Sequence, residues 1–449
     1  MNETIVAIST SYTAGAISIV RLSGDDAIDI VNKSFKGKDL TKVNTNTINY
    51  GHIYDGKEML DEVMVSVMRA PKTYTKEDVV EINCHGGQFV TQKVLELMIK
   101  NGARMAEAGE FTKRAFLNGR IDLTQAEAVM DMIDAKTKES LKLASVALRG
   151  DVKEKINVLR AKLVNCIAKI EVNIDYPEYE DEEQITQEVL LPILKDVKKD
   201  ILETIEKSEV SSIIKDGIST AIIGKPNVGK SSLLNGFLRE TKAIVTDIAG
   251  TTRDIVEGKV NIGGIILNLI DTAGIRETTD IIEQIGVEKS LDEINKADLI
   301  ILVFDNSQEL TKEDIDLLAK TKERNRIILV NKRDLDNKLD LSKIDDYILV
   351  SALNENDICK IEQKIRNMYS LNDLDNIDAT YISNTRQKAK LHEALNYINN
   401  AIDGAINGQL VDIINIDITL GYKALGDIIG ANSSESLVNE LFSKFCLGK

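Results

Sequence analysis

The sequence of 449 residues predicts a multidomain protein of the α+β and α/β classes. From residue 215 to 372, apolar strand-like runs alternate with amphipathic segments, which is typical of a parallel sheet with helices on both faces. The segments 119–214 and 373–449 have helical periodicity, and residues 1–118 mix short strand-like runs with a helix. We therefore expect an α+β N-terminal domain and a helical bundle in two parts, with the α/β domain inserted between those parts.

Composition and charge indicate which compartment and which binding partners the protein can have. The chain is 43% hydrophobic and 29% charged, and its net charge is −16. No apolar run approaches the ~20 residues of a membrane span, and the first residues lack the pattern of a signal peptide. Four widely spaced cysteines form no metal or disulfide pattern, so we expect a cytoplasmic protein without membrane contact. Because an acidic chain gains little from neutralising phosphates, any RNA must be held by a basic patch or a basic partner.

The N-terminal domain is expected to contain four strands, at residues 5–8, 16–20, 62–67 and 79–82. A helix is expected from 88 to 100, because its apolar residues fall on one stripe. Two charged residues stand out: Arg21 ends one apolar run, and Glu81 lies inside another. The pattern leaves open whether each is a surface residue or whether the two form an ion pair with each other.

The helical parts are expected to begin at a capping box, Thr124-Gln125-Ala126-Glu127. Apolar residues at steps of three and four from 156 to 174 predict a long helix. Further helices are expected at 190–205, 389–405, 412–425 and 435–445. The segment 176–183 holds a proline and five acidic residues, so it is either a solvated loop or an interaction segment.

A phosphate-binding loop is predicted at 224–232, where the pattern G-x-x-x-x-G-K-S lies between a strand-like run and a helix-like run. Gly224 and Gly229 let the backbone curl so that its N–H groups point at phosphate oxygens. Lys230 reaches the β- and γ-phosphates, Ser231 offers its hydroxyl to Mg²⁺, and the helix N-terminus adds positive charge. The expected nucleotide contacts in this loop are Asn227, Val228, Gly229, Lys230, Ser231 and Ser232.

Two polar segments follow the loop in the order expected of a nucleotide hydrolase. A threonine in the first segment, Thr252, can complete Mg²⁺ coordination and sense the γ-phosphate. In the second segment Asp271 directs negative charge toward the metal, and Gly274 can turn its N–H to the γ-phosphate. The expected contacts are Thr246, Asp247, Ile248, Ala249, Gly250, Thr251, Thr252, Asp271, Thr272, Ala273 and Gly274.

Base recognition is expected from two segments that follow later strands. In Asn331-Lys332-Arg333-Asp334, the Asp334 carboxylate can accept hydrogen bonds from guanine N1–H and the N2 amine. Adenine lacks that pair of donors, so the motif selects GTP over ATP. Backbone N–H groups of Ser351, Ala352 and Leu353 would contact guanine O6. Five motifs in this order, each at a strand end, predict a GTP hydrolase.

The group that orients the attacking water is not obvious from the sequence. Many signalling GTPases carry a glutamine at the position of Ile275, and isoleucine cannot polarise water. Nearby candidates are Arg276, Glu277 and Glu283. A second cation could also replace the missing arginine finger. The oxygen ligands of a bound K⁺ would come from Asn227, Thr246, Ile248 and Thr251.

Taken with these motifs, the whole chain resembles the family of the tRNA-modification GTPase MnmE (TrmE). The family's C-terminus matches Phe445-Cys446-Leu447-Gly448-Lys449, with Leu447 where the family usually has isoleucine. Arg120 stands where several members have lysine, which keeps the positive charge. The other matching segments are 15–24, 81–87, 111–120, 246–254 and 271–274.

The resemblance implies a folate-binding-like N-terminal domain that mediates dimerisation and an inserted Ras-like P-loop GTPase domain. It implies that Glu283 positions the water and that K⁺ stimulates hydrolysis. It also implies that Cys446 acts near a one-carbon unit, the alternative being a buried cysteine without a role. The cofactor would be a tetrahydrofolate derivative (5,10-methylene- or 5-formyl-), bound by Arg21, Glu81, Arg120 and Lys449.

The resemblance also implies partners. With the FAD protein MnmG (GidA), the family adds a carboxymethylaminomethyl-type group to C5 of the wobble uridine of certain tRNAs. This implies a homodimer, a heterotetramer with MnmG, and tRNA bound through the complex. Two alternatives stay open. One is an RNA-binding or ribosome-assembly GTPase, which would need a basic RNA-binding domain, and the other is a stand-alone folate one-carbon transferase with a regulatory GTPase.

Overall fold

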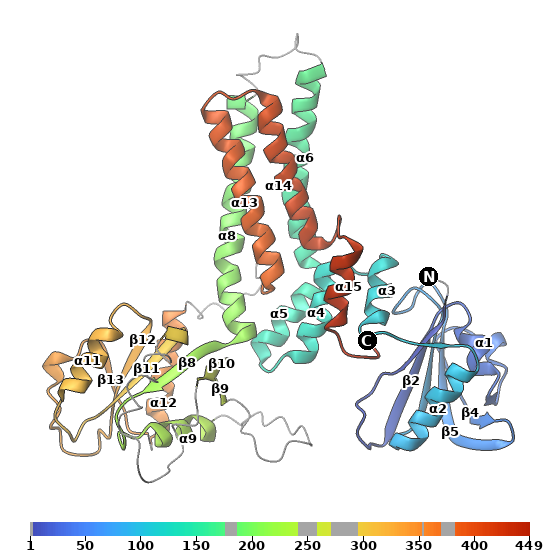
Figure 1. Cartoon of the computed structure of the whole chain (residues 1–449), viewed down its shortest axis with the longest axis horizontal. Coiled ribbons are helices and arrows are strands. Elements are labelled where there is room, and N and C mark those ends of the chain that lie inside the picture. Colours follow the sequence, from blue (N-terminus) through green and yellow to red (C-terminus); the bar gives the residue numbers. More distant parts are fainter. Residues whose placement is uncertain (1–2, 176–185, 241–257, 271–294, 353, 370–381) are drawn as a thin grey trace. The chain divides into compact units, whose positions relative to one another are not determined.

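The computed structural model of the chain describes residues 3–175, 186–240, 258–270, 295–352, 354–369 and 382–449 (Figure 1). The chain forms two compact units. The first unit contains residues 1–130, 147–194 and 396–449, and the second contains residues 131–146 and 195–395. Within the described ranges, no helix is both long enough and apolar enough to cross a membrane.

A seven-stranded sheet in the order β3-β4-β5-β6-β2-β1-β7 forms the centre of the N-terminal part of the first unit. All neighbouring strands are antiparallel except β1 and β7, which are parallel. All four predicted strands are present, although Arg21 does not end its strand, which continues to Ser23. The strands are β1 (Ile5–Ile8), β2 (Ile17–Ser23), β3 (Phe35–Lys36), β4 (Thr47–Asp55), β5 (Glu58–Met68), β6 (Val79–His85) and β7 (Arg104–Met105).

The two faces of this sheet differ. Helices α1 (Ala27–Asn32) and α2 (Gln88–Lys100) pack on one face and bury its alternate apolar side chains (Figure 1). On the other face, Phe111 of α3 (Glu110–Leu117) packs against Ile5 and Ala7 of β1. The same face exposes apolar side chains on the neighbouring strands: Ile17, Ile48, Tyr50 and Met64.

The helical parts agree with the periodicity in the sequence. In the first unit α6 (Asp151–Asp175) packs lengthwise against α14 (Val411–Ile429) (Figure 1). In the second unit the Lys388 ammonium donates to the Ser212 hydroxyl, which joins the start of α13 to the end of α8. The other helices are α4 (Leu123–Asp134), α5 (Lys138–Arg149), α8 (Leu191–Asp216), α13 (Thr385–Ile406) and α15 (Glu435–Ser443).

The capping residue of α4 is Asp122, so the predicted box at Thr124 is wrong by two residues. Asp122 Oδ1 accepts hydrogen bonds from the backbone N–H of Thr124 at 2.7 Å and of Gln125 at 3.1 Å. In return, Gln125 Oε1 accepts from the Asp122 N–H at 3.0 Å. The Thr124 hydroxyl donates to the same carboxylate at 2.6 Å, so it lies inside the first turn. One carboxylate oxygen accepts all three donors, which a threonine hydroxyl cannot do.

The second unit contains a six-stranded sheet in the order β13-β12-β11-β8-β10-β9. All strands are parallel except β9, which is antiparallel to β10. Five of these strands coincide with the apolar runs of the sequence, at residues 221–223, 265–270, 299–304, 327–330 and 348–350, whereas β9 is short and half polar and gives no such run. The strands are β8 (Ile218–Ile223), β9 (Lys259–Ile262), β10 (Ile265–Leu269), β11 (Leu299–Asp305), β12 (Arg326–Asn331) and β13 (Tyr347–Leu349).

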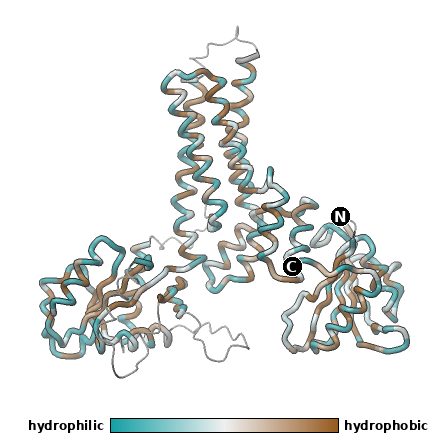
Figure 2. Tube along the Cα trace, in the orientation of Figure 1, coloured by the Kyte–Doolittle hydropathy of each residue, from teal (hydrophilic) through white to brown (hydrophobic). Residues whose placement is uncertain are grey.

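Helices cover both faces of this sheet, as the sequence predicted. Helices α9 (Lys230–Glu240) and α12 (Glu355–Met368) pack on the face that contains Ile301 and Val303. Helix α11 (Lys312–Lys320) packs on the opposite face. The central strands are strongly hydrophobic along their length (Figure 2), because they are buried on both sides.

Candidate functional site

The predicted phosphate-binding loop leaves the carboxyl end of β8 and enters α9. Gly229 has a φ of +99°, and a Cβ at this position would clash with the Asn331 side-chain amide. A Cβ at Gly224 would clash with the carbonyl oxygen of Val303. Both glycines are therefore required by close approach of neighbouring chain, which is the physical reason for their spacing in the motif.

Two lysines belong to this loop. The Lys230 ammonium donates to the carbonyl oxygens of Gly224 and, at 2.8 Å, of Lys225. The Lys225 ammonium forms an ion pair with Asp314 of α11 at 2.6 Å and also donates to the Thr311 hydroxyl. Lys225 thus ties the loop to the N-terminus of α11, while Lys230 bonds to carbonyl oxygens of the loop itself.

Asn331 joins the loop to the segment expected to contact the base. Its side-chain N–H donates to the carbonyl oxygen of Val228 at 2.9 Å, and its Oδ1 accepts from the Ala352 N–H at 3.0 Å. The Ser351 N–H donates to Asp357 Oδ2 at 2.9 Å, and Asp357 is fully buried. These bonds fix three predicted segments at one edge of the sheet.

Lys332 connects the loop to a residue that the sequence analysis missed. Its ammonium lies 2.6 Å from Asp305 Oδ2 and 2.8 Å from the carbonyl oxygen of Asn227. Burial raises the pKa of Asp305, but the hydrogen bonds from Lys332 and Ser307 outweigh burial and hold the pKa below its ordinary value. The only sequence signal for Asp305 is its place at the end of the apolar β11 run.

The other residues predicted to contact the nucleotide are either exposed or lie outside the described residues. Ser231 and Ser232 lie exposed in the first turn of α9, and Asp334 is exposed just beyond β12. Within the described parts of the chain, no group of three or more His, Cys, Asp or Glu residues could hold a metal ion. The other predicted residues lie outside the described residues: Thr246 to Thr252, Asp271 to Gly274, Ile275, Arg276, Glu277, Glu283 and Leu353.

In the first unit the structure brings together the residues expected to bind folate. Arg21 Nε lies 2.8 Å from Glu81 Oε1, and the two residues are cross-strand neighbours in β2 and β6. They therefore form the mutual ion pair that the sequence left open. Arg21 Nη1 also donates to the carbonyl oxygen of Gly448 at 3.3 Å, and the Ser9 hydroxyl donates to the same oxygen at 3.1 Å.

Aromatic side chains complete this cluster. The Arg120 guanidinium lies 4.5 Å from the ring centre of Tyr74, and the Arg21 guanidinium lies 6.0 Å from the same ring. The Arg21 guanidinium is also 5.7 Å from the ring centre of Phe111. Such contacts favour the charged guanidinium groups. Nothing in the spacing of the sequence singles out Tyr74, which lies between β5 and β6.

The C-terminal tail is held by its backbone and by two phenylalanines. Phe442 and Phe445 are buried against side chains of α3 and α4, whereas Leu447 is 50% exposed and does not anchor the tail. The Gly109 N–H donates to the carbonyl oxygen of Cys446 at 3.3 Å. Gly448 has a φ of +87°, and a Cβ there would clash with the carbonyl oxygen of Ile8.

Two residues of the tail, Cys446 and Lys449, have roles that the family resemblance implies. Cys446 is exposed and not buried, and its role near a one-carbon unit stays a prediction. Lys449 is half-buried, and its N–H donates to the carbonyl oxygen of Cys446 at 3.4 Å. The tail therefore turns back on itself next to Arg21.

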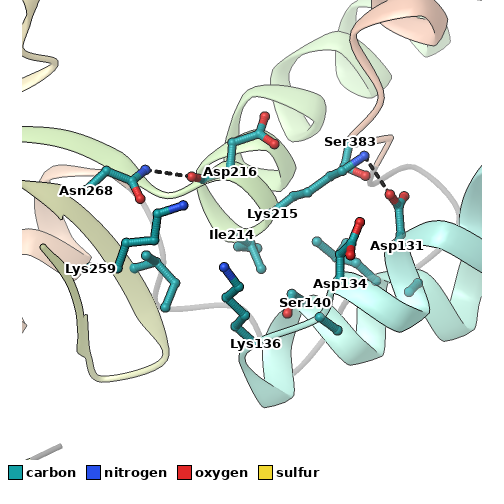
Figure 3. Close-up of a pocket in the computed structure, with 14 residues that line it drawn as sticks. Asp131, Asp134, Lys136, Ser140, Ile214, Lys215, Asp216, Lys259, Asn268 and Ser383 are labelled. Atoms are coloured by element: carbon teal, nitrogen blue, oxygen red, sulfur yellow. Dashed lines mark hydrogen bonds and ion pairs between the residues drawn. The ribbon is translucent and has the colours of Figure 1, made fainter. Parts of the chain in front are cut away.

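A separate pocket of about 360 Å³ lies in the second unit (Figure 3). Lys215 and Asp131 form an ion pair at 2.7 Å on its wall, and the Asn268 amide donates to the Asp216 carbonyl oxygen at 2.8 Å. Lys259 projects toward it from β9. Among the described residues that line this pocket, none belongs to the predicted sites.

The fold and the loop geometry define a P-loop GTPase, because the phosphate-binding loop and the base-recognition segment meet at the carboxyl edge of a largely parallel sheet. The family model of the MnmE helical domain matches residues 123–446, and the model of the GTP-binding protein TrmE N-terminus matches residues 4–120. The chain belongs to the family of the tRNA modification GTPase MnmE.

Several relatives match the chain along its whole length. The tRNA modification GTPase MnmE of Lactococcus lactis subsp. lactis is 51% identical over 448 residues, covering 100% of this chain and 98% of that protein. Those of Bacillus mycoides and Enterococcus faecalis are 50% and 52% identical, and each match also covers 100% of this chain. These matches cover 99% and 98% of those proteins. A solved structure of Era with MgGDPNP and 16S ribosomal RNA matches 34% of this chain and 56% of that chain, with 26% identity and a TM-score of 0.25.

Proposed function

We propose that this protein hydrolyses GTP as part of an enzyme that modifies C5 of the wobble uridine of tRNA. The observation that carries the proposal is the pair of hydrogen bonds made by Asn331, which joins the phosphate-binding loop to residue 352. Relatives that share about half of its residues along the whole chain are tRNA modification GTPases.

In this proposal the phosphates lie on the loop and the base lies beyond β12 and β13. Lys230 neutralises phosphate charge, and Asp334 accepts the two guanine donors. The hydroxyls of Ser231 and Thr252 hold Mg²⁺, which stabilises negative charge on the phosphates. The backbone curl at Gly229 and the helix N-terminus at Lys230 support this arrangement, because both direct N–H groups toward an anion.

We also propose that K⁺ binds next to the loop and that Glu283 positions the water. Asn227 supports the first point: its φ is +63°, and its carbonyl oxygen is held by Lys332, so its position is fixed by the fold. Thr246, Ile248 and Thr251 would supply further oxygen ligands. Ile275 leaves the usual water-orienting position without a polar group, which supports a separate residue for that role.

The first unit is proposed to bind a tetrahydrofolate derivative, either 5,10-methylene- or 5-formyl-tetrahydrofolate, which supplies a one-carbon unit. Glu81 would bind the pterin, and Arg21 forms an ion pair with its carboxylate. Arg120 and Lys449 would add positive charge, and the exposed Cys446 would lie near the one-carbon unit. The convergence of Arg21, Glu81 and the Gly448 carbonyl oxygen supports this assignment.

The proposed assembly is a homodimer that joins MnmG in a heterotetramer in the cytoplasm. The exposed apolar side chains Ile48, Tyr50 and Met64, which are 69%, 64% and 46% exposed, support a dimer contact on the sheet. The net charge of −16 supports tRNA binding through the partner.

Mass spectrometry of tRNA nucleosides tests the proposal. A deletion strain should lose the wobble-uridine modification, and the wild-type gene should restore it, whereas Lys230→Ala should not. A normal nucleoside profile in the deletion strain would refute the proposal, and a defect in ribosome profiles alone would favour a ribosome-assembly GTPase. Modification by the purified protein with labelled folate and tRNA but without MnmG would favour a stand-alone transferase.

A further inference from the structure

A histidine–aspartate pair lies at the end of β6, outside the residues assigned so far. His85 Nδ1 is 2.7 Å from Asp61 Oδ1, and the His85 backbone N–H donates to Asp61 Oδ2 at 2.7 Å. The Glu62 N–H also donates to Asp61 Oδ1 at 2.9 Å. The Asp61 side chain is only 9% exposed, whereas the His85 side chain is 69% exposed. The buried carboxylate therefore fixes one ring nitrogen, and the imidazole projects into solvent.

His85 and Glu81 share one face of the same strand. Side chains alternate along β6, with Val80, Ile82 and Cys84 buried and Glu81 and His85 on the opposite face. The four-residue separation corresponds to roughly 13 Å along a strand. On the neighbouring strand β2, Arg21 lies opposite Glu81 and Ile17 lies opposite His85. A ligand bound at Glu81 can therefore follow β2 and β6 toward His85.

The charges around the imidazole favour its protonated form. The pKa of His85 is raised above its ordinary value, first by the hydrogen bond to Asp61 and then by the charges of Asp61 and Glu62. From β4, His52 lies opposite Glu62 in the register. The neighbours from β2 and α2, Ile17 and Gln88, are uncharged. His85 is therefore cationic at and below its ordinary pKa, and loses its charge only as the pH rises above that value.

We propose that His85, oriented by Asp61, binds the carboxylate tail of the folate whose pterin lies at Glu81. This assignment rests on the proposed folate site and names the part of the ligand that a second position recognises. Folate carries its glutamate carboxylates beyond an aminobenzoyl bridge, at a distance of roughly 10–15 Å from the pterin by ordinary bond lengths. That distance matches the spacing of Glu81 and His85, and a protonated imidazole is a suitable donor to a carboxylate.

Two ligands that differ only in the glutamate distinguish binding of the folate carboxylates from binding of the pterin. Binding of 5-formyl-tetrahydrofolate is compared with binding of 5-formyl-tetrahydropteroate, which lacks the glutamate, by calorimetry on the full-length protein. Wild type should bind the glutamate form more tightly by about three- to tenfold, the range between an exposed ion pair and a charge-assisted hydrogen bond. His85→Gln should remove this preference and leave binding of the pteroate unchanged. His52→Gln, which alters another histidine on the same sheet, should keep the preference.

The pH dependence of the preference for the glutamate form shows whether His85 binds the ligand or only supports the structure. The wild-type preference should be present below the ordinary imidazole pKa of about 6.5 and should fall as the pH rises above it, as the imidazole loses its proton. In Asp61→Asn the pKa of His85 falls, so the preference should vanish at neutral pH and return below about pH 6. If Arg120→Gln, and not His85→Gln, removes the preference for the glutamate form, the folate carboxylates do not bind at His85 and the proposal is wrong. If wild type binds neither ligand, the folate site itself is refuted; if it binds both equally, only the tail assignment fails.

Discussion

The side-chain amide of Asn331 lies 2.9 Å from the carbonyl oxygen of Val228, so a residue of the segment proposed to recognise the base holds the predicted phosphate-binding loop directly. The same amide would clash with any side chain at Gly229. Because Asn331 is 2% exposed, its bonds are shielded from water. Asn331 therefore connects the predicted phosphate and base halves of the site, as Lys332 also does through the Asn227 carbonyl oxygen, and changes in one half are expected to affect the other.

Asn331→Ala tests this connection. The substitution removes both hydrogen bonds and leaves the partly buried N–H of Ala352 and the buried carbonyl oxygen of Val228 without their partner. At about 1 kcal/mol for each bond, the affinity for GTP should fall roughly 10- to 100-fold. A titration with a fluorescent guanine nucleotide measures the effect. Asn356→Ala, an exposed asparagine on α12, is the control and should bind normally. Equal affinities of the two variants would contradict the structural role.

Asp334→Asn tests base specificity. The carboxylate is expected to accept two hydrogen bonds from guanine, each worth about 1.5–3 kcal/mol, so GTP affinity should fall by at least about 100-fold. Xanthine carries an oxygen where guanine carries the N2 amine, so the asparagine amide can donate to it. The variant should therefore favour XTP over GTP in a competition titration. Asp336→Asn, two residues further along the exposed segment, should keep the GTP preference. Unchanged GTP binding by Asp334→Asn would refute this assignment.

Hydrolysis is expected to depend on K⁺. Asn227 is fixed by its backbone and by Lys332, and Ile275 cannot orient water, so a cation is expected to supply positive charge at the phosphates. GTP turnover should be faster in KCl than in NaCl at equal ionic strength. Asn227→Ala should bind GTP but lose most of this difference. Equal turnover of the wild type in the two salts would remove the K⁺ site.

The sequence predicted the GTPase part well because its signals are local. Gly229 and Asn331 fall in short motifs at strand ends, and the buried strands around them are continuous apolar runs. Contacts between distant segments could not be predicted in this way. Nothing in the sequence shows that Gly448 packs on Ile8, or that Arg21 and Arg120 both lie near the Tyr74 ring.

The sequence also did not show the role of one buried charged residue, and it misplaced the capping residue of one helix. Asp61 occupies a position that alternation assigns to the core, and only the structure pairs it with His85. The cap of α4 was misplaced because Asp122 and Thr124 are both good capping residues, and their bonds, not their types, decide between them.

Gly448→Ala tests whether the tail must lie against the N-terminal sheet. Gly448 has a φ of +87°, and an added Cβ would clash with the carbonyl oxygen of Ile8, so the substitution should displace the tail from Ser9 and Arg21. Cys446 and Lys449 would move with it. We expect wobble-uridine modification to be lost in a deletion strain that carries this variant, while the purified protein hydrolyses GTP at a rate close to that of the wild type.

The reason for this separation is that the tail belongs to the first unit and the phosphate-binding loop to the second. Leu447→Ala is the matched control, because that side chain is 50% exposed and the backbone around it is unchanged. It should support normal modification. Cys446→Ser should lose modification without displacing the tail, if the thiol acts in the chemistry. Full modification by Gly448→Ala, measured by mass spectrometry of tRNA nucleosides, would show that the position of the tail has no part in the reaction.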